Sequence, residues 1–271
     1  MNWSLSILIA CIGSCLIYLP VQAIPHNVAA PAIPVSPALS PEQVREVARS
    51  IAVKVLCGDT CGSGILIAKQ GQIYTVLTND HVLTAGYGKP YRIQTPDGRI
   101  YPATVLRASG FGGDDLGLLQ FGSSASYRLA SLPVSSTLAV GDRVFAAGFP
   151  VEAEEFVFNS GEISLILDRA LGGGYQIGYT NDIQKGMSGG PVLNDRGEVV
   201  GINAIHAYPL WERPYVFKDG SIPSAPMQQE MMRLSWAVPV QTFLELGGLK
   251  SSLRTVIRER PNSSHQPELL W

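Results

Sequence analysis

The sequence predicts an all-β protein with two six-stranded antiparallel β-barrels or sheets in tandem. Short apolar runs separated by Gly, Pro, Asp and Asn form two series, a pattern typical of strands joined by tight turns. The 28 Gly and 19 Pro are spread along the 271 residues, which fits many short strands. Amphipathic segments of helix length are missing between the runs, so we do not expect a parallel βαβ sheet.

Twelve apolar runs justify the two barrels. The first series contains the runs IAVKVL, GILIA, IYTVLT, YRIQT, YPATVL and LGLLQF. The second series contains the runs RVFAAGF, EFVFNSGEISLIL, YQIGYT, PVLN, EVVGINAI and LSWAVPV. We place barrel one at about residues 50–122 and barrel two at about residues 140–240.

A short helix is expected at each end of the β region. Ser40 is a capping residue, Pro41 occupies the first helical position and Gln43 completes a capping box. Apolar residues follow at helical spacing, namely Val44, Val47, Ala48 and Ile51. After the last apolar run, VQTFLELGGL predicts a closing helix that ends at glycine.

The first 23 residues have the character of an export signal. They are apolar, lack charged side chains and end in Val21-Gln22-Ala23, a small-residue cleavage pattern. We therefore expect cleavage near Ala23 and a secreted or periplasmic protein. Two alternatives stay open: a retained membrane anchor, because no Lys or Arg precedes the apolar run, and a lipoprotein box ending at Cys11.

The remaining segments divide around one folded domain. Residues 24–40 are proline-rich and nearly uncharged, which predicts an extended spacer. The domain is expected at residues 41–250, with a polar tail at 251–271. A long insertion, residues 207–233, contains the aromatic residues Tyr208, Trp211, Tyr215 and Phe217. These aromatics favour a flap that packs on the domain over a floppy tether.

Two cysteines remain once the signal is removed, Cys57 and Cys61. Their Gly-Asp-Thr spacer allows a tight turn, and an exported protein meets oxidising conditions, so a disulfide between them is predicted. A zinc site would need two further ligands at suitable spacing, which the sequence lacks, and no metal or other cofactor is expected. Two free or partly buried thiols are the alternative.

Ser188, in the stretch GMSGGPV, is the candidate nucleophile. A serine hydroxyl is a weak nucleophile near neutral pH, so it needs a base and a group that orients the base. Two of the four histidines lie in the spacer and the tail, which leaves His81 and His206. His81 follows an apolar strand and is the better candidate. Asp115 directly precedes Leu116 in an apolar run and is preferred to Asp114 as the orienting acid.

The segments TNDHVL, DDLGLL and GMSGGPV, in this order, resemble the His, Asp and Ser signatures of trypsin-like serine proteases with the chymotrypsin fold. The resemblance covers roughly residues 40–248 and is nearest to bacterial secreted members related to high-temperature-requirement and glutamyl proteases. It implies that His81 is the general base, Asp115 fixes its tautomer and Ser188 attacks the scissile carbonyl of a polypeptide. The N–H groups of Gly186 and Ser188 would form the oxyanion hole.

Two further residues are candidates for substrate binding. Asp182 stands six residues before Ser188, where the resemblance places a carboxylate that binds Arg or Lys. Asn181-Asp182 is otherwise an ordinary turn. His206 is an alternative determinant that would favour acidic side chains, although its offset differs by several residues. Met187 replaces the aspartate with which trypsin pairs its new N-terminus, so we expect it to pack in the core.

Two rival functions are compatible with parts of the sequence. Residues 186–190 also satisfy the G-x-S-x-G elbow of α/β-hydrolase esterases, but that fold needs an acid and a histidine after the serine and a strand-to-helix turn. A catalytically silent binding module with the protease fold is the other alternative. The net charge of −2 provides no general attraction to nucleic acid, and a membrane partner is expected only if the signal segment is retained.

Overall fold

A computed structural model describes the ranges 37–58, 62–107, 111–133, 138–153, 155–208 and 215–246. The predicted export signal, Cys61, Trp211 and the polar tail lie outside these ranges, so the predictions that depend on them stay predictions. The same holds for the domain boundaries. None of the helices within the described ranges combines the length and the apolar character needed to span a bilayer.

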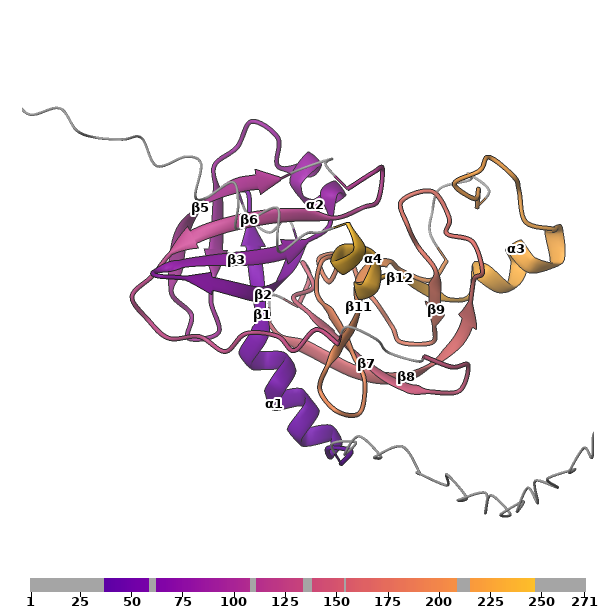
Figure 1. Cartoon of the computed structure of the whole chain (residues 1–271), viewed down its shortest axis with the longest axis horizontal. Coiled ribbons are helices and arrows are strands. Elements are labelled where there is room, and N and C mark those ends of the chain that lie inside the picture. Colours follow the sequence, from indigo (N-terminus) through magenta and orange to yellow (C-terminus); the bar gives the residue numbers. More distant parts are fainter. Residues whose placement is uncertain are drawn as a thin grey trace, which may run out of the picture. The chain divides into compact units, whose positions relative to one another are not determined.

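The first barrel is closed and antiparallel (Figure 1). Its strands are β1 (Ala52–Leu56), β2 (Gly62–Gln70), β3 (Ile73–Thr78), β4 (Tyr91–Gln94), β5 (Ile100–Arg107) and β6 (Gly117–Gly122). Their order around the barrel is β1-β2-β3-β6-β5-β4, and β4 pairs with β1 to close it. All six predicted runs of the first series form strands.

The second barrel repeats the arrangement. Its strands are β7 (Arg143–Gly148), β8 (Val157–Ile166), β9 (Ile177–Tyr179), β10 (Pro191–Leu193), β11 (Val199–Ile205) and β12 (Ser235–Pro239). They close in the order β10-β11-β12-β9-β8-β7. The prediction of an all-β fold with two six-stranded antiparallel barrels is confirmed.

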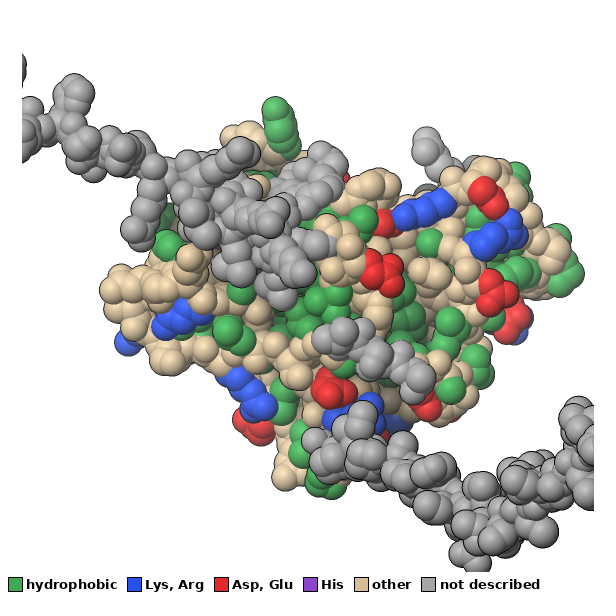
Figure 2. Space-filling model, viewed as in Figure 1, with side chains coloured by type: hydrophobic (Ala, Val, Ile, Leu, Met, Phe, Trp, Pro, Cys, Tyr) green, Lys and Arg blue, Asp and Glu red, His purple; other side chains and the backbone are tan. Residues whose placement is uncertain are grey.

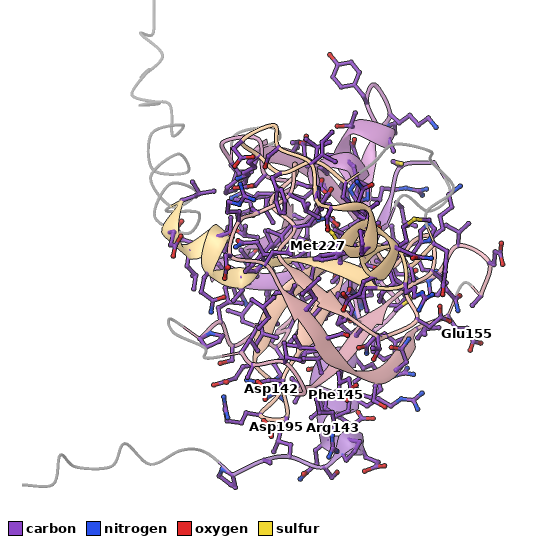
Figure 3. The ribbon with its side chains drawn as sticks, turned by 90° about the vertical axis from the view of Figure 1, so that its right-hand side faces the viewer. Asp142, Arg143, Phe145, Glu155, Asp195 and Met227 are labelled. Carbon is purple, nitrogen blue, oxygen red and sulfur yellow. The ribbon has the colours of Figure 1, made fainter. Side chains whose placement is uncertain are left out.

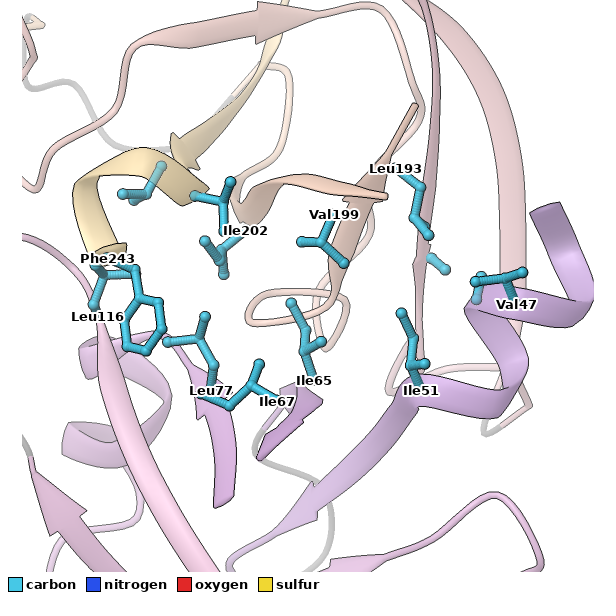
Figure 4. Packing of buried hydrophobic residues seen from close by; sticks show 14 of the residues in the cluster. Val47, Ile51, Ile65, Ile67, Leu77, Leu116, Leu193, Val199, Ile202 and Phe243 are labelled. Atoms are coloured by element: carbon cyan, nitrogen blue, oxygen red, sulfur yellow. The ribbon is translucent and has the colours of Figure 1, made fainter. Parts of the chain in front are cut away.

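Apolar side chains from both barrels and from two helices share one buried cluster (Figure 4). Ile65 and Leu77 come from the first barrel, and Leu193 and Ile202 come from the second. All four are 0 % exposed. Because side chains of both barrels interdigitate here, the position of each barrel depends on the packing of the other.

Both predicted terminal helices are present and cover this shared cluster. In α1 (Pro41–Ile51), Ser40 and Gln43 form the predicted capping box. The helix buries Val44, Val47, Ala48 and Ile51. In α4 (Val240–Glu245), Phe243 is fully buried in the same cluster. Each helix thus uses its apolar face to hold the barrels together.

Two helices were not predicted. The first, α2 (Asp80–Ala85), follows β3 directly where a strand end was expected. The second, α3 (Ala225–Met231), lies inside the long insertion. Its Met227, labelled in Figure 3, packs at the edge of a cluster around Trp236. Tyr215 joins this cluster with its ring 5.9 Å from that of Trp236, so this part of the insertion packs on the second barrel as predicted.

Charged side chains of opposite sign alternate over the face seen in Figure 2. No patch of one sign gathers on the part of this face that the structure describes. This distribution agrees with the small net charge of the chain, and it offers no extended basic surface to a polyanion on that face.

Candidate active site

His81 lies in the first turn of α2, just after β3. Asn79 has extended backbone angles, φ −86° and ψ 153°, and so ends the strand and begins the helix. Its side-chain amide donates a hydrogen bond of 2.8 Å to the carbonyl oxygen of Asp115. Asn79 is thus the N-cap residue of the helix by its backbone, while its side chain holds the aspartate segment next to it.

The Asp115 carboxylate accepts two hydrogen bonds from His81. Its Oδ1 accepts from the backbone N–H at 2.9 Å, and its Oδ2 accepts from the ring Nδ1 at 2.7 Å. A carboxylate only accepts, so the hydrogen of the neutral imidazole lies on Nδ1 and Nε2 keeps its lone pair. The Asp115 side chain is 7 % exposed and that of His81 is 47 % exposed. The ring thus has one buried, anchored nitrogen and a solvent-accessible edge.

The loop that contains Ser188 packs against the end of β3. A Cβ built on Gly189, which has φ +84°, would lie 2.3 Å from Thr78 Oγ1 and 2.2 Å from the Ser63 carbonyl oxygen. Only glycine fits this approach. The Ser63 N–H donates to the Ser188 carbonyl at 2.8 Å, which joins β2 to the same loop.

The segments that contain His81 and Ser188 both pack against Gly62. A Cβ built on Gly62 would lie 2.7 Å from the side chain of Val82 and 3.0 Å from the carbonyl oxygen of Ser188. Val82 is the neighbour of His81 in α2, so the two candidate residues lie on facing segments. The Ser188 hydroxyl donates at 3.0 Å to the carbonyl of Ala204, and within the described residues it makes no hydrogen bond to His81.

The backbone around Ser188 presents two N–H groups without acceptors among the described residues, those of Gly186 and Ser188. The carbonyl of Lys185 accepts from Val151 at 2.9 Å, and that of Met187 accepts from Gly190 at 3.0 Å. In a trans peptide the N–H points opposite to the carbonyl. Both N–H groups therefore point away from the Val151 and Gly190 amides, which bind the carbonyl groups of the same peptides. In this orientation they can donate to an anionic oxygen.

The second aspartate of the DDLGLL segment has a different partner. Asp114 is 5 % exposed and forms an ion pair with Lys218 of the insertion. Its backbone also bridges Gly173, in the segment between β8 and β9. Of the two neighbouring carboxylates, only that of Asp115 contacts His81. Sequence reasoning did not identify Lys218, because no local pattern links it to a residue that lies 104 positions earlier in the chain.

A tyrosine that sequence reasoning also missed contacts the aspartate beside His81. The hydroxyl of Tyr175 donates at 2.9 Å to Asp115 Oδ2, the oxygen that His81 Nδ1 also contacts. Burial, and next the Asp115 carboxylate, raise the pKa of Tyr175 well above its ordinary value. The phenol is therefore a neutral donor wherever an imidazole titrates.

The two candidate specificity residues make no hydrogen bond to His81, Asp115 or Ser188 among the described residues. The Asp182 side chain is exposed and accepts a hydrogen bond of 3.4 Å from Gln184. His206 is half-buried, and its Nδ1 lies 2.8 Å from the carbonyl oxygen of Ala207. Neither contact tests a role in substrate binding, so both assignments stay predictions.

Two neighbouring predictions concern sulfur-containing residues. Met187 is 0 % exposed and packs in the core cluster of the second barrel, as expected. Cys57 is buried, whereas Cys61 lies outside the described residues, so their disulfide stays a prediction. Over the described ranges, His, Cys, Asp and Glu side chains form no group of three that could hold a metal ion.

Comparison with known proteins agrees with this fold. A serine endoprotease structure from Yersinia pestis matches 81 % of this chain and 67 % of its own, with a TM-score of 0.56 and 21 % identity. A DegP-like protein of Buchnera aphidicola, named as a probable periplasmic serine endoprotease, is 35 % identical over 52 % of this chain and 29 % of its own length. The serine endoprotease DegS of Haemophilus influenzae is 33 % identical over 53 % of this chain and 41 % of its own.

The alignments with the two curated relatives leave most of each relative's length unmatched, since the chain spans about a third of these proteins. The family assignment has a separate basis. Residues 62–202 match the family model described as the trypsin-like peptidase domain. This range contains His81, Asp115 and Ser188, and it extends over more than half of the sequence. The chain therefore belongs to the trypsin-like peptidase family.

Proposed function

We propose that this protein is a serine endopeptidase that hydrolyses polypeptides through Ser188, His81 and Asp115. The observation that carries the proposal is the hydrogen bond of 2.7 Å between His81 Nδ1 and Asp115 Oδ2, because it leaves Nε2 as the basic nitrogen. The N–H groups of Gly186 and Ser188, which have no acceptor in the described part of the chain, would supply an oxyanion site on the same loop as the hydroxyl.

The proposed reaction begins when the Ser188 hydroxyl rotates from the Ala204 carbonyl towards His81. His81 Nε2 takes its proton while Oγ bonds to the scissile carbonyl carbon, and the oxyanion accepts from Gly186 and Ser188. The C–N bond then breaks as the same proton passes to the leaving amine, which gives an acyl-enzyme. His81 then takes a proton from a water molecule, whose oxygen bonds to the acyl carbon. The ester bond between that carbon and Ser188 Oγ breaks, the acid leaves, and His81 returns the proton to Oγ.

Labelling with a fluorophosphonate tests the proposal on the folded full chain. We expect stoichiometric modification of Ser188, found by peptide mass mapping, and cleavage of an unfolded polypeptide such as casein. Ser188→Ala should abolish labelling. His81→Ala should lower the labelling rate about 10⁴-fold or more, because the serine then has no base. Ser160→Ala removes an exposed hydroxyl of β8 and is the matched control.

Two results would contradict the proposal. Absence of labelling in folded wild-type protein would favour the catalytically silent binding module. Labelling of Ser188 that survives intact in His81→Ala would show that the imidazole is not its base. Because the reagent reports the nucleophile directly, neither result depends on knowing the natural substrate or the cleavage preference.

We also propose that the protein acts outside the cytoplasm. The uncharged apolar start of the chain, with its cleavage pattern at Ala23, supports export. The word periplasmic in the name of one relative agrees with this location. Expression in a Gram-negative host, followed by N-terminal sequencing of the periplasmic fraction, should give a mature chain that begins near residue 24. A full-length chain in the cytoplasm would contradict export.

A further inference from the structure

Tyr175 links the second barrel to the aspartate that contacts His81. It lies between β8 and β9, whereas Asp115 and His81 belong to the first barrel. We propose that Tyr175 is a positioning residue for catalysis, which acts through Asp115 on the orientation and basicity of His81. This inference rests on the proposed function of the Ser188, His81 and Asp115 group.

The contacts of the carboxylate give the first argument. Among the described residues, the Asp115 carboxylate accepts three hydrogen bonds, two from His81 and one from Tyr175. Of these three hydrogen bonds, only the one from Tyr175 comes from a residue other than His81. Without it, Oδ2 would have His81 Nδ1 as its single donor. A buried carboxylate with fewer donors is less well fixed and is a stronger acceptor towards the one that remains.

The segment that presents the hydroxyl is itself held against both aspartates. The N–H of Asp115 donates to the Gly173 carbonyl at 2.8 Å. A Cβ built on Gly174, which has φ +84°, would lie 2.3 Å from Asp114 Oδ1, so the backbone there approaches as closely as glycine allows. The Leu171 N–H closes the loop by donating to the Tyr175 carbonyl at 2.9 Å. The position of the phenol is therefore set by the backbone on both sides.

Three other charged residues lie next to Asp115 or His81. Asp114 and Lys218 pair with each other beside Asp115, and Asp80 adjoins His81 in α2. Tyr175 is neutral, so its removal changes no charge. Its effect on the imidazole must pass through the shared oxygen Oδ2. This route distinguishes positioning by the hydroxyl from the packing of the ring, which contacts two hydrophobic clusters.

Tyr175→Phe separates the two roles, because phenylalanine keeps the ring and loses only the hydroxyl. The control is Tyr74→Phe, which removes a buried hydroxyl that contacts Ala125 in the first barrel. For each folded variant, the pH profile of kcat/KM on a peptide substrate and the low-field proton resonance of His81 Nδ1–H are measured. The resonance is assigned by its loss in His81→Ala.

We expect Tyr175→Phe to lower kcat about tenfold with little change in KM. Since Oδ2 then binds Nδ1–H more strongly, the protonated imidazole is favoured, and the acid limb of the profile should move to higher pH by about 0.5 unit. The Nδ1–H resonance should shift as well. Tyr74→Phe should leave the limb and the resonance at their wild-type positions.

A Tyr175→Phe variant with the wild-type acid limb and an unshifted Nδ1–H resonance would overturn the inference. The resonance can be read even in an inactive protein, so this test does not depend on turnover. Failure of the proposed function would appear separately, as wild-type protein that does not label at Ser188. The two outcomes are therefore distinguishable in the same set of samples.

Discussion

The hydroxyl of Ser63 donates a hydrogen bond of 2.7 Å to the carbonyl oxygen of Gly186. The same hydroxyl accepts at 2.9 Å from the N–H of Phe149, and Ser63 is 0 % exposed. The Ser63 side chain of the first barrel thus holds two parts of the second barrel: the turn that contains Gly186, and the end of β7. The geometry of the candidate oxyanion site therefore depends on contact between the barrels.

Ser63→Ala should weaken both the site and the fold. The substitution leaves the Phe149 N–H and the Gly186 carbonyl without this partner, so the free energy of unfolding should fall by about 1–3 kcal/mol. The fluorophosphonate labelling rate should fall about tenfold as the turn loosens. Urea unfolding and timed labelling measure the two effects. If Ser63→Ala labels as fast as the exposed-site variant Ser160→Ala, the turn does not need this contact.

Gly186→Ala should impair labelling far more than stability. Gly186 has φ +100°, and an added Cβ would lie 2.6 Å from the Phe149 carbonyl oxygen and 2.8 Å from the Val151 nitrogen. The turn must then shift and misplace its free N–H, so the labelling rate should fall about 10²- to 10³-fold. The strain of φ itself should cost about 1–2 kcal/mol of unfolding free energy.

Gly141→Ala is the matched control for this strain. Gly141 has φ +91° and no atom within 4 Å of an added Cβ. By urea unfolding it should lose only the φ strain of about 1–2 kcal/mol, less than Gly186→Ala loses with its added backbone clash, and its labelling rate should be that of wild type. Equal labelling in Gly186→Ala and Gly141→Ala would mean that the Gly186 N–H is not a donor to the oxyanion.

The strands could be predicted because their signals are local. The run IYTVLT alone indicates β3, and Ile73–Thr78 is the strand observed, since turn residues bound it on both sides. The helix α2 could not be predicted in this way. Its six residues are too few for a helical period, and the buried pair Val82 and Leu83 resembles a continuing strand. Its first turn is held by Asp115, which lies more than thirty residues later.

In the candidate site, too, only the residues in local sequence patterns could be predicted. His81, Asp115 and Ser188 stand in short recognisable segments, so the sequence could single them out. Tyr175 and Lys218 stand in segments without such a pattern, and each meets its aspartate only when the second barrel docks on the first. Contacts of this kind depend on tertiary packing, which a single sequence does not display.

The ion pair of Asp114 with Lys218 should tie the insertion to the first barrel. The Asp114 side chain is 4 % exposed and that of Lys218 is 42 % exposed. Lys218→Met leaves the buried Asp114 carboxylate without its cation, so the free energy of unfolding should fall by about 1–3 kcal/mol. This loss is smaller than for a fully buried ion pair, because the lysine is partly solvated. Asp114→Asn should cost less, since the freed ammonium can turn to water.

A double-mutant cycle in urea measures this coupling. The double variant should be more stable than the sum of the single losses predicts, by about 1 kcal/mol. Additive losses within about 0.3 kcal/mol would show that the two side chains do not stabilise each other. Labelling rates of the same proteins show whether loss of the ion pair also disturbs the neighbouring Asp115.

The fully buried Tyr179 should make the fold sensitive to alkali. Burial raises the pKa of Tyr179 far above its ordinary value of about 10. Above about pH 10 the unfolded chain releases the Tyr179 proton while the folded chain keeps it. The contribution of Tyr179 to the free energy of unfolding is therefore fully present below about pH 10 and falls as the pH rises. The loss from one such group approaches about 1.4 kcal/mol per pH unit. Tyr179→Phe should therefore show a shallower decline of unfolding free energy between about pH 10 and pH 11.

At neutral pH the same variant should be less stable than wild type by about 1 kcal/mol, because the hydroxyl donates to Asn203 at 2.8 Å. The two curves of unfolding free energy against pH should converge as the pH rises, which a simple loss of packing would not produce. Tyr87→Phe, at a residue that is 90 % exposed, should run parallel to wild type. If the Tyr179→Phe curve also runs parallel, alkaline unfolding must begin at another group.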